Sequence, residues 1–71
     1  MRYLVVLEKA ETGYGAYVPD LPGCVAVGQT RDETLRLIRE AIEFHIEGLR
    51  TQEEEIPLPS SSAELVEIGA E

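Results

Sequence analysis

The chain has 71 residues, of which 44% are hydrophobic and 28% are charged, and its formal net charge at pH 7 is −8. This composition is typical of one small globular domain and unlike that of a disordered chain. Because an acidic protein repels phosphate backbones, we expect no direct nucleic-acid binding and favour a basic protein as the partner.

A single domain of this length (residues 1–71) buries only about 60% of its unfolded surface, so its hydrophobic core is thin. Oligomerisation would supplement such a core, and we expect a homodimer or tetramer. No apolar run approaches the ~20 residues of a membrane span, and no signal peptide is apparent after Met1. The single cysteine, Cys24, cannot form an internal disulfide, which suits a reducing cytoplasmic location.

Three short segments rich in β-forming residues come first in the chain. Tyr3–Leu7 is apolar on both faces, which predicts a strand that is central or covered on both sides. Tyr14–Val18 follows a polar connection that ends in Gly13, so it should pair with the first strand as an antiparallel hairpin. With Val25–Gln29 as the third strand, the sequence predicts a three-stranded antiparallel meander.

A turn-forming stretch separates the second and third predicted strands. Pro19 ends a strand because it lacks the N–H for the next ladder bond, and Pro22 has a restricted φ. Gly23 can adopt a positive φ, and the carboxylate of Asp20 can accept hydrogen bonds from nearby backbone N–H groups. These four residues predict a rigid corner, for which a structural role is favoured over a catalytic one.

The clearest pattern predicts a helix from about Arg31 to about Arg50. Thr30 with Glu33 three residues later forms a capping box at its start. At roughly 100° per residue, one stripe of apolar side chains faces the sheet, namely Leu35, Ile38, Ile42, Ile46 and Leu49. The charged residues gather on the remaining arc, which looks solvated.

A second apolar flank lies beside that stripe and makes the apolar arc wider than one contact with a small sheet requires. It consists of Leu37, Ala41, Phe44 and Gly48. Two interpretations are equally favoured. The flank is either an oligomer or partner surface, or it lies under the C-terminal segment.

The region after the helix is acidic: residues 51–71 contain six of the fourteen acidic residues and no lysine or arginine. The prolines of Ile56–Pro59 exclude a helix there, and Ser60–Ser62 reads as a loop. Ala63–Ile68 predicts a last short strand at the sheet edge, with a short helical turn as the alternative.

The search for chemistry yields no catalytic, cofactor or metal site. His45 is the only histidine, and it falls on the apolar side of the helix, which favours a packed or interface residue. Cys24 has no nearby cation or second cysteine to lower its pKa, so we expect it in the core. A small hydrolase that uses His45 with Glu8 or Asp20 is the less favoured alternative.

Several short motifs together carry a family resemblance. They are Gly13-Tyr14, Pro19–Cys24, Gly28-x-Thr30-x-x-Glu33, Glu40–Ile42 and Ile56-Pro57-x-Pro59. In this order and spacing the chain resembles the HicB antitoxin family over nearly its whole length. The resemblance implies an α+β fold of type β-β-β-α-β. In that fold the meander packs on one helix, like a truncated ribonuclease H core without the nuclease carboxylates.

The same resemblance implies a function. HicB-type proteins bind and neutralise HicA, a small basic ribonuclease toxin, and the acidic charge suits such a partner. Many members also carry a C-terminal DNA-binding module, but nothing after Leu49 forms a basic reading head, so we expect the short form. We therefore expect a steric antitoxin without enzymatic activity, with a stand-alone oligomeric scaffold as the alternative.

Overall fold

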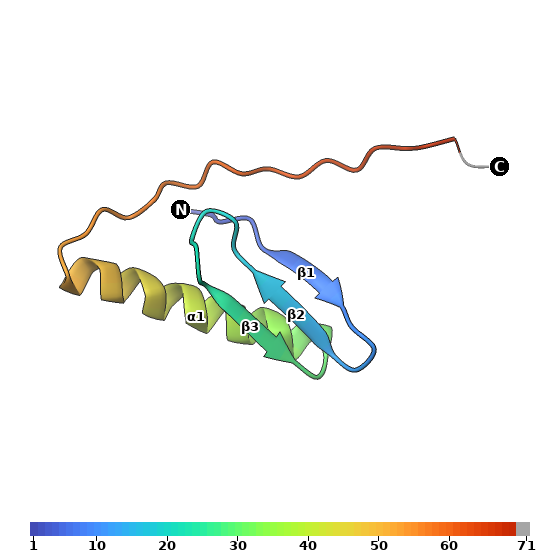
Figure 1. Ribbon diagram of the computed structural model, residues 1–71, viewed down its shortest axis with the longest axis horizontal. Coiled ribbons are helices and arrows are strands. Elements are labelled where there is room, and N and C mark those ends of the chain that lie inside the picture. The colour runs from blue at the N-terminus through green and yellow to red at the C-terminus, as the bar shows by residue number, and fades with distance from the viewer. Residues whose placement is uncertain (70–71) are drawn as a thin grey trace.

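The computed structural model describes residues 1–69, in which three strands precede one helix. The strands are β1 (Val6–Lys9), β2 (Tyr14–Tyr17) and β3 (Val25–Gly28), and the helix is α1 (Arg31–Thr51). They form one antiparallel sheet in the order β1-β2-β3, and α1 packs against β2 and β3 (Figure 1). The predicted α+β meander on one helix is confirmed.

The first strand begins later than predicted, at Val6 instead of Tyr3. The register pairs Val6 with Tyr17 and Lys9 with Tyr14, so β2 provides neighbours for only four residues of β1. After Tyr17 the chain turns into the corner, where Pro19 has no N–H to continue the ladder. Residues 1–5 therefore extend past the end of β2 without a strand partner.

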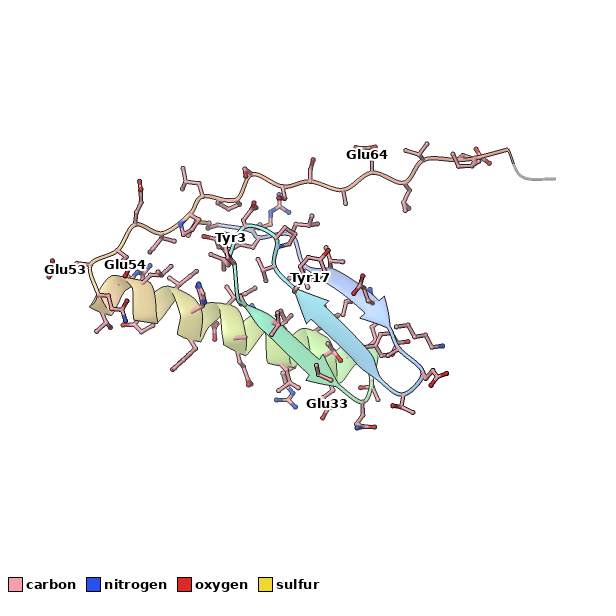
Figure 2. The ribbon with its side chains drawn as sticks, viewed as in Figure 1. Tyr3, Tyr17, Glu33, Glu53, Glu54 and Glu64 are labelled. Atoms are coloured by element: carbon pink, nitrogen blue, oxygen red, sulfur yellow. The ribbon has the colours of Figure 1, made fainter. Side chains whose placement is uncertain are left out.

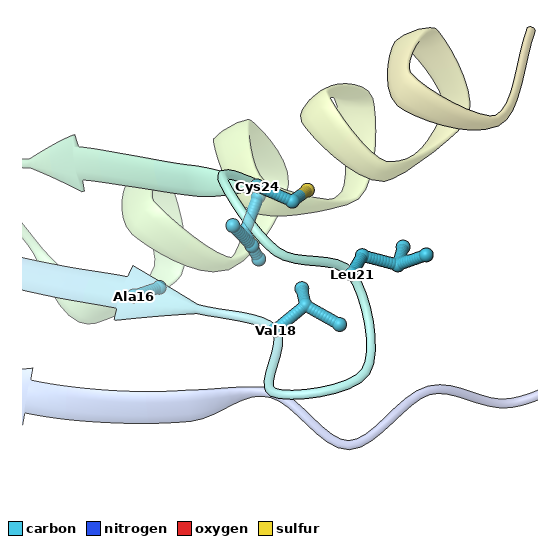
Figure 3. Close-up of a cluster of buried hydrophobic side chains, with 5 residues drawn as sticks. Ala16, Val18, Leu21 and Cys24 are labelled. Carbon is cyan, nitrogen blue, oxygen red and sulfur yellow. The ribbon is translucent and has the colours of Figure 1, made fainter. Parts of the chain in front are cut away.

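The hydrophobic core lies between α1, β2 and the corner. Its buried hydrophobic side chains are Ala16, Val18, Leu21, Cys24 and Ile38 (Figure 3). The helix approaches β3 closely, because a Cβ added to Gly28 would lie 2.5 Å from Oγ1 of the buried Thr34. A side chain at Gly28 would therefore push β3 away from α1.

Local hydrogen bonds define both ends of α1. At its start, Oγ1 of Thr30 accepts from the backbone N–H of Glu33 at 3.0 Å, and the carboxylate of Glu33 accepts from the N–H of Gln29 at 2.6 Å. At its end, Glu53 adopts a left-handed φ of 57°, which turns the chain out of the helix. No helix within residues 1–69 combines the length and apolar character needed to cross a bilayer.

The predicted C-terminal strand Ala63–Ile68 is not formed. Residues 54–69 are extended, and none of them pairs with the sheet (Figure 1). A strand needs a neighbouring backbone to complete its hydrogen bonds, and this stretch runs past the sheet without meeting an edge. The prediction was wrong because β-propensity alone does not supply a pairing partner. We call residues 52–69 the tail.

Candidate partner-binding surfaces

The predicted helix flank, Leu37, Ala41, Phe44 and Gly48, is only partly free. Phe44 is 82% exposed and Gly48 is also exposed, whereas Leu37 and Ala41 are half-buried. Ala41 packs against the core cluster. The exposure of Phe44 means that the tail does not cover it. The flank therefore offers one large apolar side chain to a partner.

A broader apolar surface lies on the face of the sheet opposite α1. Residues paired across antiparallel strands point to the same face, and the register aligns Val6, Tyr17 and Val25 in one row. Val27 lies on this face too, in the row of Glu8. Tyr17, Val25 and Val27 are 41%, 62% and 75% exposed. We call Val6, Tyr17, Val25 and Val27 the open sheet face.

The sequence predicted that the first strand would be central or covered on both sides, and this was wrong, because β1 lies at the edge of the sheet and one face of the sheet is open. The signal for an open face was present in the alternation of Val25 and Val27 with Ala26 and Gly28. That alternation places both valines opposite the helix-facing Gly28. Valines favour strands wherever they point, so composition alone did not distinguish a covered face from a free one.

An apolar groove runs between the unpaired residues 1–5 and α1. One wall is formed by Met1, Tyr3 and Val5, and the other by helix residues. The helix residues are Leu35, Ile38, Arg39, Ile42, Glu43 and Ile46. The groove has a volume of about 530 Å³. We call it the edge groove, because it lies along the free side of the sheet next to β1.

Asp20 binds the tail to the corner through hydrogen bonds. Its carboxylate accepts hydrogen bonds from the backbone N–H groups of Ser60 and Ser61, both at 2.9 Å, and from both serine hydroxyls at 3.2 and 2.8 Å. These bonds, led by the one from the Ser61 backbone, lower the pKa of Asp20 to about 2. Thus the partners of Asp20 lie forty residues away in sequence, and not in its own corner as the turn chemistry suggested.

The other corner residues shape the turn itself. Gly23 has a positive φ of 86°, and the N–H of Cys24 donates to the carbonyl of Leu21 at 3.0 Å. A second fastening of the tail lies nearby, where the hydroxyl of Tyr3 donates to the carbonyl of Pro57. Tail residues 57–61 are therefore held against the rest of the domain by two hydrogen-bonded contacts, one from Tyr3 in the N-terminal segment and one from Asp20 in the corner.

The residues of the hydrolase alternative are not assembled into a site. Within residues 1–69, no hydrogen bond joins the half-buried His45 to Glu8 or Asp20, and the Asp20 carboxylate is occupied by the two serines. Burial raises the pKa of the Cys24 thiol, which disfavours the thiolate nucleophile. The same residues contain no group of three His, Cys, Asp or Glu side chains that could hold a metal ion.

Comparison with known proteins identifies relatives over most of the chain. Residues 3–69 match the family model described as the HicB-like antitoxin of bacterial toxin–antitoxin systems. A UPF0150 protein of Thermoplasma acidophilum is 47% identical over 58 residues, covering 80% of this chain and 84% of that protein. Antitoxin HicB 2 of Photorhabdus laumondii is 39% identical over 75 residues, covering 99% of this chain and 51% of that protein.

The chain spans less than half of another relative, an uncharacterised 14.9 kDa protein of Haemophilus phage HP1. The two are 46% identical over 57 residues, which are 80% of this chain and 43% of the phage protein. Among solved structures, a chain of a complex described as the HicA3 and HicB3 toxin–antitoxin complex superposes with a TM-score of 0.72 at 30% identity, covering 84% of this chain and 70% of that one. The protein belongs to the HicB-like antitoxin family.

Proposed function

We propose that this protein is an antitoxin module that binds a small, basic HicA-type ribonuclease toxin and blocks it sterically. The observation that carries the proposal is the fold match, over 84% of this chain, to a chain of a HicA3–HicB3 complex. The net charge of −8 independently favours a basic partner, because opposite charges accelerate encounter and exclude acidic competitors.

We assign toxin binding to the open sheet face. It carries three exposed apolar side chains, Tyr17, Val25 and Val27, which can form the dry centre of an interface. Glu8 lies in the row of Val27 and is exposed, so a carboxylate adjoins the apolar centre on the same face. An apolar patch with an acidic neighbour suits a basic protein that also buries apolar surface.

The test is inhibition of the ribonuclease by the purified chain. A HicA-type toxin is sought in the reading frame next to that of this chain, and its cleavage of RNA is measured with increasing amounts of the chain. We expect stoichiometric inhibition together with a stable complex in titration calorimetry. Absence of both binding and inhibition at low salt would overturn the proposal.

A matched pair of variants locates the interface. Val27→Arg places a positive charge on the open sheet face, where it should repel a basic toxin and weaken binding at least tenfold. Phe44→Arg makes the same change at an equally exposed position on the helix flank, and should leave binding within about twofold. The reverse result would assign the toxin to the helix flank. Because both side chains are largely exposed, both variants should fold.

The absence of enzymatic activity is tested on the same preparation. We expect the chain alone to leave RNA intact at neutral pH, because His45 has no carboxylate partner within residues 1–69. Cleavage by the chain alone that disappears in His45→Ala would favour the hydrolase alternative.

A further inference from the structure

The last residues of the tail are apolar and unpartnered. Leu65, Val66 and Ile68 are 102%, 74% and 74% exposed, although the stretch from Ala63 to Ile68 is rich in strand-forming residues. Figure 2 shows Glu64 on this stretch, out beside the sheet and not against it. A solvated linker has no need of three large aliphatic side chains, so their placement indicates a surface that becomes covered.

The hydrogen bonds of Tyr3 and Asp20 to the tail direct residues 63–68 away from their own domain. Residues 57–61 are held by Tyr3 and Asp20, and the chain then continues past the edge of the sheet (Figure 1). The helix α1 is about 32 Å long at 1.5 Å per residue, yet the molecule measures 52 Å along its longest axis. The tail accounts for the difference by projecting beyond the body.

The stretch after Ser62 lacks the residues that would turn it back. No Gly, Pro, Asn or Asp occurs between Ser62 and Ile68, and these are the residues that form tight reversals. Tyr3, which forms one wall of the edge groove, also holds Pro57. The chain therefore passes its own groove at residue 57, and residues 63–67 continue without a turn towards it.

The edge groove is complementary to a strand of this kind. Residues 1–5 are extended and have no strand partner, so their backbone groups are free for a new ladder. Residues 1–5 span about 17 Å as a strand, and residues 63–68 at about 20 Å are long enough to pair along all of them. Val66 and Ile68 would share one face, toward the apolar helix wall of Leu35, Ile42 and Ile46.

From these features we propose that the protein is a tail-exchanged dimer, in which residues 63–68 of each copy form a fourth strand along residues 1–5 of the other copy. Both halves of the contact lie on one chain, so reciprocal exchange closes a two-fold dimer with no tail left over. The exchange also enlarges a core that, within residues 1–69, has only five buried hydrophobic side chains. The proposal does not rest on the antitoxin function, and the open sheet face remains free in such a dimer.

Cross-linking between two differently marked chains tests the exchange. In a Cys24→Ala background, chains with Val66→Cys are mixed, unfolded and refolded with chains that carry Glu43→Cys at the edge groove. A short bis-maleimide should join the two kinds of chain into a heterodimer. The control replaces Glu43→Cys by Phe44→Cys, which is exposed but outside the groove and should give little product. Cross-linking only at Phe44 would overturn the proposal in favour of the helix flank.

The oligomeric state gives a second readout. The full chain should be a dimer by light scattering at about 100 µM, and Leu65→Asp with Ile68→Asp should shift it to monomer. Glu64→Gln with Glu67→Gln alters the same stretch without removing apolar surface and should leave the dimer intact. A monomeric wild-type chain would overturn the proposal. So would an intramolecular cross-link in a single chain that carries both Glu43→Cys and Val66→Cys, because the tail would then occupy its own groove.

Discussion

Several single residues in this protein matter for the backbone conformation that they permit, and not for a reactive side chain. Gly28 permits the close approach of β3 to Thr34, and Gly23 allows the corner to close at a φ of 86°. Glu53 adopts a left-handed φ without being glycine, at the point where the chain leaves α1. The polar residue with the largest structural role is Asp20, which forms four hydrogen bonds to two serines.

Replacement of Gly23 isolates the cost of backbone strain. A Cβ at Gly23 would meet no atom within 4 Å, so Gly23→Val creates no clash and only forces a β-branched residue into the left-handed region. We expect a loss of about 1–2 kcal/mol in the free energy of unfolding, or somewhat more because of the branching. The measurement is urea denaturation followed by circular dichroism.

The matched control for Gly23→Val is Gly15→Val. Gly15 also has open space around its Cβ direction, but it lies in β2 with an ordinary φ, where valine is favoured. We expect Gly15→Val to be neutral or stabilising. Equal losses in the two variants would show that strain at Gly23 is not the cause.

At the scale of elements, the corner between β2 and β3 has two tasks. It joins the strands, and through Asp20 it holds the tail at Ser60 and Ser61. The tail makes no ladder with any strand in residues 1–69, so these hydrogen bonds and the one from Tyr3 to Pro57 set its course. The position of the tail therefore depends on the charge of the Asp20 carboxyl group.

We predict that acid releases the tail from the corner. The pKa of Asp20 is lowered from 3.8 to about 2 when the tail is held, so the contact stabilises the structure fully above pH 3.8. That stabilisation is lost as the pH falls from 3.8 towards 2, because the protonated carboxyl accepts the serine N–H bonds poorly. The backbone amide signals of Ser60 and Ser61 in NMR spectra should shift in this interval.

Asp20→Asn provides the control for acid release. At neutral pH its Ser60 and Ser61 amide signals should already lie at the positions of the acid form, while the amide of Ile38 in α1 reports whether the domain stays folded. Signals of Ser60 and Ser61 that are unchanged in Asp20→Asn would contradict a role for Asp20 in holding the tail.

For the whole molecule, the proposed toxin binding combines charge with apolar surface. A charge of −8 would attract a basic toxin at long range, whereas the open sheet face would act only on contact. The acidic residues are also unevenly distributed, since six of the fourteen follow residue 50 without any lysine or arginine. This separation predicts that salt affects the formation of a toxin complex more than its lifetime.

We expect the association rate constant with the toxin to fall about tenfold or more between low salt and about 0.5 M NaCl. Screening shortens to about 8 Å at physiological ionic strength, so steering at a distance is lost first. The dissociation rate constant should change little, because apolar contacts such as those of Val25 and Val27 do not depend on screening. Surface plasmon resonance over a salt series measures both constants. A salt effect on the dissociation rate constant alone would contradict the prediction that charge acts mainly on association.

The sequence by itself determined the elements that depend on neighbours along the chain. The alternation of apolar residues, the glycine and proline corner and the Thr30 cap each act within a few residues, so β2, β3 and α1 could be predicted almost to their ends. The first strand was predicted at Tyr3–Leu7 and lies at Val6–Lys9, because its bounds depend on where β2 offers a partner. The motifs distributed between Gly13 and Pro59 were enough for the resemblance to the HicB family, which the comparisons confirmed.

Only the tertiary structure decided which surfaces are free. The bond between Asp20 and Ser61 spans 41 positions, and no local pattern announces a partner so distant. β-propensity predicted a strand at Ala63–Ile68, but whether a strand forms depends on a free edge within reach, and the fastened tail passes its own edge. The open sheet face and the edge groove likewise arise from where α1 packs, because a single helix covers one face of the sheet and leaves the other exposed.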